Sequence, residues 1–267
     1  MSGHSKWETT KRQKAVVDAK RGAAFTKLGN MIAIAARGGT DPDMNPALAM
    51  AIDKAKHANM PAANIQRAID RVADKNAATL EEIVYEAYGP GGIGIIIETA
   101  TDNRNRTFPE VKSTLTKNGG AIADQGSVAF QFDRKGVIHV DATGDDNLMT
   151  ILDAGAEDAV EDDGEITAYT DMKDLHKVRQ AIIDAGLTVA DAGLEYVAKN
   201  KVEISDIETA QKALKLLNAL DDLDDVTNVH TNADITAKIW YNTDVGLLMS
   251  LYYLFIKPTI DGVWRSW

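Results

Sequence analysis

The segment from Met1 to Lys27 carries lysines and arginines whose spacing suits phosphate binding. Residues Glu8–Arg21 contain no glycine or proline and are predicted to form a helix. On a helix that turns about 100° per residue, Lys11, Lys14 and Arg21 fall within an arc of about 80°, with Lys6 just before the first turn. Such a stripe can follow the phosphate backbone of a nucleic acid, although an ordinary solvent-facing helix surface shows the same pattern. The predicted phosphate contacts of this segment are Lys6, Lys11, Arg12, Lys14, Lys20, Arg21 and Lys27.

The charge of the chain is segregated between its first quarter and the rest. Residues 1–75 hold 13 basic and 7 acidic residues, a net charge of +6, whereas the other 192 residues carry −17 and the whole chain −11. A cationic segment on an anionic protein attracts polyanions to one surface and repels them elsewhere. We therefore expect nucleic acid to bind residues 1–75, and the acidic remainder to orient that segment or to engage protein partners.

A second pair of candidate phosphate contacts lies further along the chain. Arg104 and Arg106 follow a predicted strand that ends near Thr101, at the start of the next predicted helix, where Asp102 or Asn103 can cap the helix. Helix starts attract anions, so both arginines are candidates for nucleic-acid binding. An internal salt bridge from Asp102 to an arginine is the alternative interpretation.

Several kinds of chemistry are excluded or disfavoured by composition and context. The chain has no cysteine, which removes disulfides, thiolate metal sites and cysteine nucleophiles. Gly89, Gly91 and Gly94 fit the spacing of a dinucleotide-binding loop, but a strand follows them where such a site needs a helix. The five histidines lack metal-ligand spacing. We expect no cofactor, no metal and no enzymatic activity and, because no secretory signal opens the chain, a cytoplasmic protein.

The elements that must position these residues form an α+β protein. Residues 1–76 predict an N-terminal helical bundle, in which Asn45 caps a helix that begins at Pro46, ends near His57 and is followed by another after Pro61. Two ferredoxin-like α/β sandwich domains follow, one inserted in the other. The predicted boundaries are 1–76 for the basic helical domain, 77–133 with 201–235 for the discontinuous domain, 134–200 for the inserted acidic domain and 236–267 for a C-terminal extension.

Hydrophobic periodicity gives the elements of both sandwiches. The outer domain is predicted from the strands 93–98 and 127–132, the helices 108–118 and 206–220 and the strand 226–230. The inserted domain is predicted from a complete βαββαβ set at 137–140, 147–154, 157–161, 165–169, 175–185 and 187–197. Because the first set is incomplete before Phe132 and its missing helix and strand appear after Lys201, insertion is the economical arrangement.

Several ordered motifs resemble the YebC/PmpR family of regulators of gene expression. They are Gly3–Trp7, Asp18–Gly22, Phe25–Leu28, Asn59–Pro61 with Asn64 and Ile65, Tyr88–Gly92, Thr101–Thr107, Lys117–Gly120, and Gly126–Val128 with Phe132–Gly136. The resemblance covers about 235 residues. It implies a helical domain with two α/β domains, and a role either as a DNA-binding transcription regulator or as a ribosome-associated factor, as in a mitochondrial relative that activates translation of a respiratory subunit.

The chain departs from the family pattern in two respects. Family members commonly carry a basic residue where Gln13 and Ala23 stand, so the cationic face here is thinner. They also usually end soon after the run Thr231–Ile235, whereas this chain continues to Trp267. The apolar stretch Val245–Ile256 is shorter than the roughly 20 residues that a membrane span requires. We expect a chain that ends at Ile235 to fold and bind as well as the full one.

The sequence therefore predicts a nucleic-acid-binding regulator of gene expression, first of all a DNA-binding transcriptional regulator. No recognition helix with base-reading side chains at defined offsets stands out, so sequence-specific DNA readout is not demonstrated. Two alternatives stay open: a ribosome-associated translation factor that binds ribosomal RNA, and a protein-interaction adaptor that does not bind nucleic acid directly.

Overall fold

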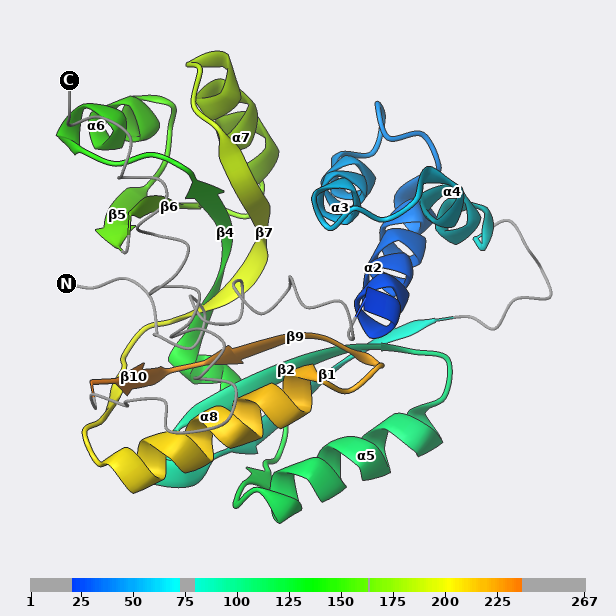
Figure 1. The fold of residues 1–267 in the computed structure, drawn as a ribbon, viewed down its shortest axis with the longest axis vertical. Helices are drawn as coiled ribbons and strands as arrows, with labels where there is room; N and C mark the ends of the chain where they lie inside the picture. Colours follow the sequence, from blue (N-terminus) through cyan, green and yellow to red (C-terminus); the bar gives the residue numbers. More distant parts are fainter. Residues whose placement is uncertain (1–20, 73–79, 163, 237–267) are drawn as a thin grey trace, which may run out of the picture. The chain divides into compact units, whose positions relative to one another are not determined.

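The computed structural model describes residues 21–72, 80–162 and 164–236, which form a mixed helix-and-sheet protein (Figure 1). The predicted helix Glu8–Arg21, except for its last residue, and the extension 237–267 lie outside the described residues. Among the described residues, no helix has the length and apolar character needed to cross a membrane.

Helices α2 (Arg21–Ala35), α3 (Pro46–His57) and α4 (Ala62–Asp70) pack around one apolar core. Ile32 and Leu48 at its centre are fully buried. The side chain of Asn45 accepts a hydrogen bond from the Leu48 amide at 3.2 Å and donates to the carbonyl of Ala35 at 2.7 Å. This confirms the predicted cap, and it shows that the same side chain ties the end of α2 to the start of α3.

The first sheet is antiparallel, with strand order β3-β1-β2-β9. Its strands are β1 (Glu81–Tyr88), β2 (Gly94–Thr101), β3 (Ala121–Ile122) and β9 (Val226–Thr231). Helices α5 (Arg104–Lys117) and α8 (Ile207–Asp221) lie along one face of it (Figure 1). Strand β1 was not predicted, and with it the elements run β1-β2-α5-β3-α8-β9. This sheet therefore does not have the ferredoxin-like order.

The predicted strand Ser127–Phe132 is wrong, because these residues form a turn and a short 3-10 helix, Ala129–Gln131. The cause is the buried side chain of Glu86. Its carboxylate accepts hydrogen bonds from the backbone amides of Gly126 at 2.5 Å, Val128 at 2.6 Å and Ala129 at 2.8 Å. Amides that converge on one carboxylate cannot also alternate along a strand, so regular pairing begins only at Phe132.

The second sheet has the strand order β5-β6-β4-β7 and is also antiparallel. In chain order its elements are β4 (Phe132–Val140), α6 (Asp145–Asp153), β5 (Asp158–Asp162), β6 (Glu165–Thr170), α7 (Leu175–Asp184) and β7 (Val189–Ala198). This is the βαββαβ succession expected for the inserted segment. Ile138, Ile151 and Ile182 are fully buried between the sheet and its helices.

The elements that follow return the chain to the first sheet. Strands β8 (Val202–Ile204) and β10 (Ala233–Ile235) pair in parallel beside α8 and β9. Because Phe132 at the start of β4 pairs with Ala198 at the end of β7, the chain enters and leaves the second sheet at neighbouring points. Independent folding of this segment, with boundaries at 134 and 200, stays a prediction.

Candidate nucleic-acid interface

Most of the predicted phosphate contacts fall outside the part of the chain that the structure describes. These residues are Lys6, Lys11, Arg12, Lys14 and Lys20. Arg21 is the first residue of α2, but its side chain is not among those that the structure describes. The stripe of cations on a helix over residues 8–21 therefore stays a prediction.

Lys27 is described, and its ammonium group is engaged within the chain. Its side chain is only 15% exposed, and the ammonium donates a hydrogen bond to the carbonyl of Asp221, the last residue of α8. The carboxylate of Asp221 lies 4.0 Å away. A cation at the carboxyl end of a helix complements the partial negative charge there. Lys27 thus joins α2 to α8, and it offers less of its charge to a ligand than the sequence suggested.

Arg106 forms an internal ion pair, which the sequence offered as the alternative to phosphate binding. Its guanidinium donates to both carboxylate oxygens of Asp225 at 2.8 Å and to Asp102 at 3.3 Å. The hydrogen bonds that Arg106 donates to Asp225 are the main reason that the pKa of Arg106 is raised. Asp225 is buried and also accepts hydrogen bonds from the hydroxyls of Thr101 and Thr107. This network holds the end of β2, the start of α5 and the start of β9 together.

Arg104 has the opposite environment at the same helix start. Asn103 caps α5, as predicted for Asp102 or Asn103, because its side chain accepts from the Asn105 amide at 3.1 Å. The side chain of Arg104 is 68% exposed, and its nearest carboxylate, that of Glu81, lies 3.9 Å away. An exposed pair at this distance contributes little, so the guanidinium of Arg104 is available to a ligand.

The structure adds exposed cations that the sequence analysis had not singled out. Lys56 lies in the last turn of α3, and Arg67 lies on α4. Lys56 is 66% exposed and 3.8 Å from Asp53, whereas Arg67 donates to Asn64, one turn earlier, at 3.1 Å. These residues contribute to the net charge of +6, but only the fold shows that they face solvent. They place described cations on α3 and α4.

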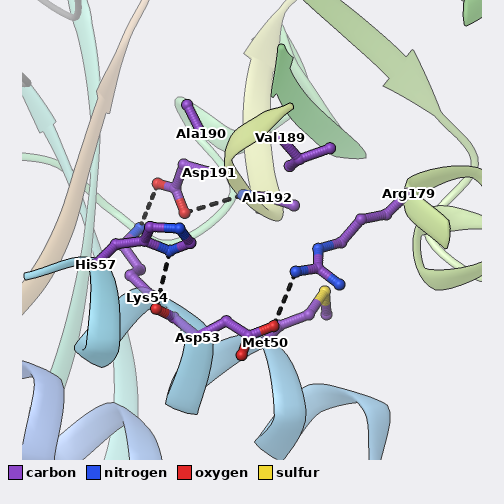
Figure 2. A pocket seen from close by; sticks show the side chains of 9 residues that line it. All are labelled: Met50, Asp53, Lys54, His57, Arg179, Val189, Ala190, Asp191 and Ala192. Atoms are coloured by element: carbon purple, nitrogen blue, oxygen red, sulfur yellow. Dashed lines mark hydrogen bonds and ion pairs between the residues drawn. The ribbon is translucent and has the colours of Figure 1, made fainter. Parts of the chain in front are cut away.

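A hollow lies between α3 and the residues of α7 and β7, and Figure 2 shows the side chains that line it. Two ion pairs cross the hollow, one with its basic residue on α3 and the other with its acidic residue there. Lys54 of α3 lies 2.9 Å from Asp191 of β7, and Arg179 of α7 lies 2.8 Å from Asp53 of α3. Because these charges already neutralise one another, the hollow is better described as a junction between helices and sheet than as a ligand site.

A second buried polar cluster joins the two sheets. Glu98 of β2 lies 3.2 Å from both His230 of β9 and Arg134 of β4, and the guanidinium of Arg134 stacks on the ring of Tyr196 in β7. Burial acts to raise the pKa of Glu98, but the hydrogen bond and charge of His230 and the charge of Arg134 outweigh it and the pKa is lowered. The carboxylate therefore stays charged and paired between the sheets.

The pKa of Glu195, on β7 of the second sheet, is set by the same opposition of burial and nearby positive charge. Burial again opposes ionisation, yet His139, 3.9 Å away, and the charges of His230 and Lys54 hold the pKa of Glu195 below its usual range. Across residues 21–72, 80–162 and 164–236, no cluster of three or more side chains is arranged to hold a metal ion. The buried charges thus link elements to one another.

The fold is that of a mixed helix-and-sheet protein in which a helical segment precedes two antiparallel sheets joined by ion pairs. Residues 5–75 match the TACO1/YebC protein N-terminal domain, and residues 80–233 match the TACO1/YebC second and third domain. The chain belongs to the TACO1/YebC family.

Relatives of known sequence and structure agree with this assignment. The chain is 50% identical over 245 residues to a probable transcriptional regulatory protein of Chlorobaculum tepidum, covering 90% of this chain and 97% of the relative. It is 54% identical over 239 residues to one of Bifidobacterium longum, covering 87% and 94%. The crystal structure of a conserved hypothetical protein from Aquifex aeolicus matches with a TM-score of 0.79 at 40% identity, covering 84% of this chain and 95% of that one.

Proposed function

We propose that this protein is a nucleic-acid-binding regulator of gene expression that binds phosphates through residues 1–75. The observation that carries the proposal is the segregation of charge, +6 on this segment against −17 on the rest. The exposed Lys56 and Arg67 add described cations to the same segment. The names of the relatives, probable transcriptional regulatory proteins, support a regulatory role.

A DNA-binding transcriptional regulator is the first form of this proposal. Its alternative is a ribosome-associated translation factor that binds ribosomal RNA. In both forms the protein acts by binding a nucleic acid. Its buried charged residues then serve to link helices and strands to one another. The two forms differ in the nucleic acid that they require: a transcriptional regulator must prefer some duplex DNA sequence, whereas a ribosome-associated factor need not.

The test is a salt titration of binding to duplex DNA and to structured RNA in parallel. If Lys6, Lys11, Lys14 and Arg21 each neutralise a phosphate, the logarithm of the association constant falls against the logarithm of salt concentration with a slope of about −3 to −4, at roughly 0.7 to 0.9 per contact. The double reversal Lys11→Glu with Lys14→Glu should remove about two units of slope without changing the melting temperature.

A matched control separates a local contact from the effect of net charge. Lys173, just before α7, and Lys177, within it, are both exposed, so Lys173→Glu with Lys177→Glu changes the net charge equally at another place. We expect the slope of this control to stay near the wild-type value. A slope near zero on both nucleic acids, unaffected by either double reversal, would instead favour the protein-interaction adaptor.

A further inference from the structure

One flank of α5 carries an exposed aromatic ring between two cations. Arg104, Phe108 and Lys112 follow one another at intervals of four residues, so they lie within an arc of about 80° and span about 12 Å along the helix. Phe108 is 41% exposed, although an aromatic side chain of this size is usually buried. The ammonium of Lys112 lies 5.9 Å from the centre of its ring.

The charge of this flank is unusual for its part of the chain. After residue 75 the chain carries −17, yet α5 has four cations and a single acid, Glu110. Glu110 lies about 160° away from Lys112 around the helix, on the other flank. Within the described part of the chain, no carboxylate forms an ion pair with Lys112, and the only one beside Arg104 is that of Glu81 at 3.9 Å.

The neighbouring strand supports the exposed ring. Tyr85 of β1 lies 5.9 Å from Phe108 between ring centres, with the two ring planes tilted by 45°. Tyr85 is partly buried, so it holds one side of the Phe108 ring while the rest faces solvent. A ring supported in this way is a fixed platform for a planar ligand, and the cations on either side of it favour an anionic one.

We propose that this flank of α5, formed by Arg104, Phe108 and Lys112, binds an unpaired stretch of RNA. A base stacks on the ring of Phe108, and the adjoining phosphates bind Arg104 and Lys112. Base stacking on an aromatic side chain is a stronger interaction than that of an exposed cation over a ring, so a base can displace Lys112 from the ring towards a phosphate. This inference rests on the proposed nucleic-acid binding and adds a second contact outside residues 1–75.

The exposed ring of Phe108 favours unpaired over paired nucleic acid as the ligand. In a duplex the faces of the bases are covered by their neighbours, so Phe108 can stack only on a base that is already unstacked. Loops and bulges supply such bases in RNA as a regular part of its structure. An acidic protein surface would match the charges of Arg104 and Lys112, but its carboxylates offer the exposed Phe108 ring no stacking partner, whereas an unpaired base offers both a phosphate and a ring.

The test measures binding of the full chain to a labelled, unstructured RNA of about 12 nucleotides by fluorescence anisotropy over a range of salt. Phe108→Leu keeps an apolar side chain but removes the ring, and it should weaken binding about 5- to 100-fold with an unchanged salt slope. Arg104→Gln with Lys112→Gln should lower the slope by about 1.4, at about 0.7 per contact on a single strand. Glu81→Gln should strengthen binding, because it removes the carboxylate that competes with phosphate.

Matched variants make each result interpretable. Phe130→Leu removes an aromatic ring that is 66% exposed outside α5, and Lys173→Gln with Lys177→Gln removes two exposed charges at α7. Neither should change RNA affinity beyond a factor of about two. All the substituted side chains are partly or fully exposed, so the melting temperatures should agree with that of the wild type.

The outcomes separate this inference from the proposed function. If the α5 variants bind like the wild type while Lys11→Glu with Lys14→Glu reduces binding, the α5 contact is wrong and the proposed function stands. If the wild type binds neither this RNA, structured RNA nor duplex DNA, both are wrong. Stronger binding to a matched duplex than to the single strand, with Phe108→Leu unaffected, would also overturn the stacking contact.

Discussion

The guanidinium of Arg106 lies 2.8 Å from both carboxylate oxygens of Asp225, a residue 119 positions further along the chain. This pair joins α5, which precedes the second sheet in the sequence, to the start of β9, which follows it. Thr101 and Thr107 complete the acceptor capacity of the buried carboxylate. The run from Thr101 to Thr107, which the sequence marks as a candidate anion site, therefore links α5 to the start of β9, and of its two arginines only Arg104 has no hydrogen-bonded carboxylate among the described residues.

Asp225→Asn should destabilise the protein markedly. An amide has one acceptor oxygen where the carboxylate has two and carries no charge, so it removes the ion pair of Arg106 and leaves the buried hydroxyl of Thr101 or Thr107 unpaired, at about 1–3 kcal/mol. We expect the melting temperature to fall by roughly 3–10 °C for a chain of this size. Arg104→Gln is the control at the same helix start and should change it by less than about 2 °C. An unchanged melting temperature in Asp225→Asn would contradict the structural role.

Glu86→Gln should remove a pH-dependent contribution to stability. Burial acts to raise the pKa of Glu86, but the amides of Gly126, Ala129 and Val128 outweigh it and the folded-state pKa is lowered. A carboxyl with a lowered folded-state pKa contributes stability above its unfolded pKa of about 4.3, and that contribution is lost as the pH falls through the folded value. The difference in unfolding free energy between wild type and variant should therefore be about 1–3 kcal/mol at pH 7 and shrink below about pH 4.

Urea unfolding at several pH values measures this difference. Glu82→Gln replaces an exposed glutamate on the same strand and should unfold like the wild type throughout. A difference for Glu86→Gln that is constant down to pH 3 would mean that the charge of the carboxylate is not what holds the turn.

Local signals in the sequence predicted the helices well. Asn45 followed by Pro46 marked the start of α3, and Asp206 marked the start of α8, where its side chain accepts from the Thr209 amide at 2.8 Å. Such caps involve residues within one turn, so they are visible in a short window. The βαββαβ succession at β4–β7 was also predicted, although β4 and β6 are buried as nearly continuous runs and not in regular alternation.

Features that depend on distant partners could not be predicted in this way. Strand β1 has glutamates at its start and an inward-facing Glu86, a pattern that reads as a solvent-exposed segment. The function of Glu86 appears only when the turn 126–129, about 40 residues later, folds over it. Likewise, nothing beside Arg106 indicated Asp225. At the candidate site, the sequence could propose both Arg104 and Arg106 as phosphate contacts. Only the fold shows that Arg106 is already paired with Asp225.

Excision of the second sheet tests the predicted domain boundaries. Because Phe132 and Ala198 are paired partners, a short linker in place of Gly136–Ala198 can close the gap without strain. We expect the remaining chain to unfold in one cooperative transition, at a lower temperature, since Phe132 loses the packing of Tyr196 and Ala198. Loss of cooperative unfolding would contradict independent folding of the inserted segment.

The ion pairs of the junction between α3 and the second sheet should show energetic coupling. Arg179 is 15% exposed and Asp53 is 35% exposed, so Asp53→Asn leaves a mostly buried guanidinium without its carboxylate. In a double-mutant cycle with Arg179→Gln, the two losses should be less than additive, with a coupling of about 0.5–2 kcal/mol because the pair is only partly shielded from water.

The exposed pair of Lys212 and Glu208 on α8, 2.6 Å apart, is the matched control and should couple more weakly than the pair of Asp53 and Arg179. Urea unfolding in low and high salt measures both cycles, and high salt should reduce the control more than the junction. Additive losses at Asp53 and Arg179 would mean that apolar contacts such as that of Met50, which packs against the core of the second sheet, hold the junction on their own.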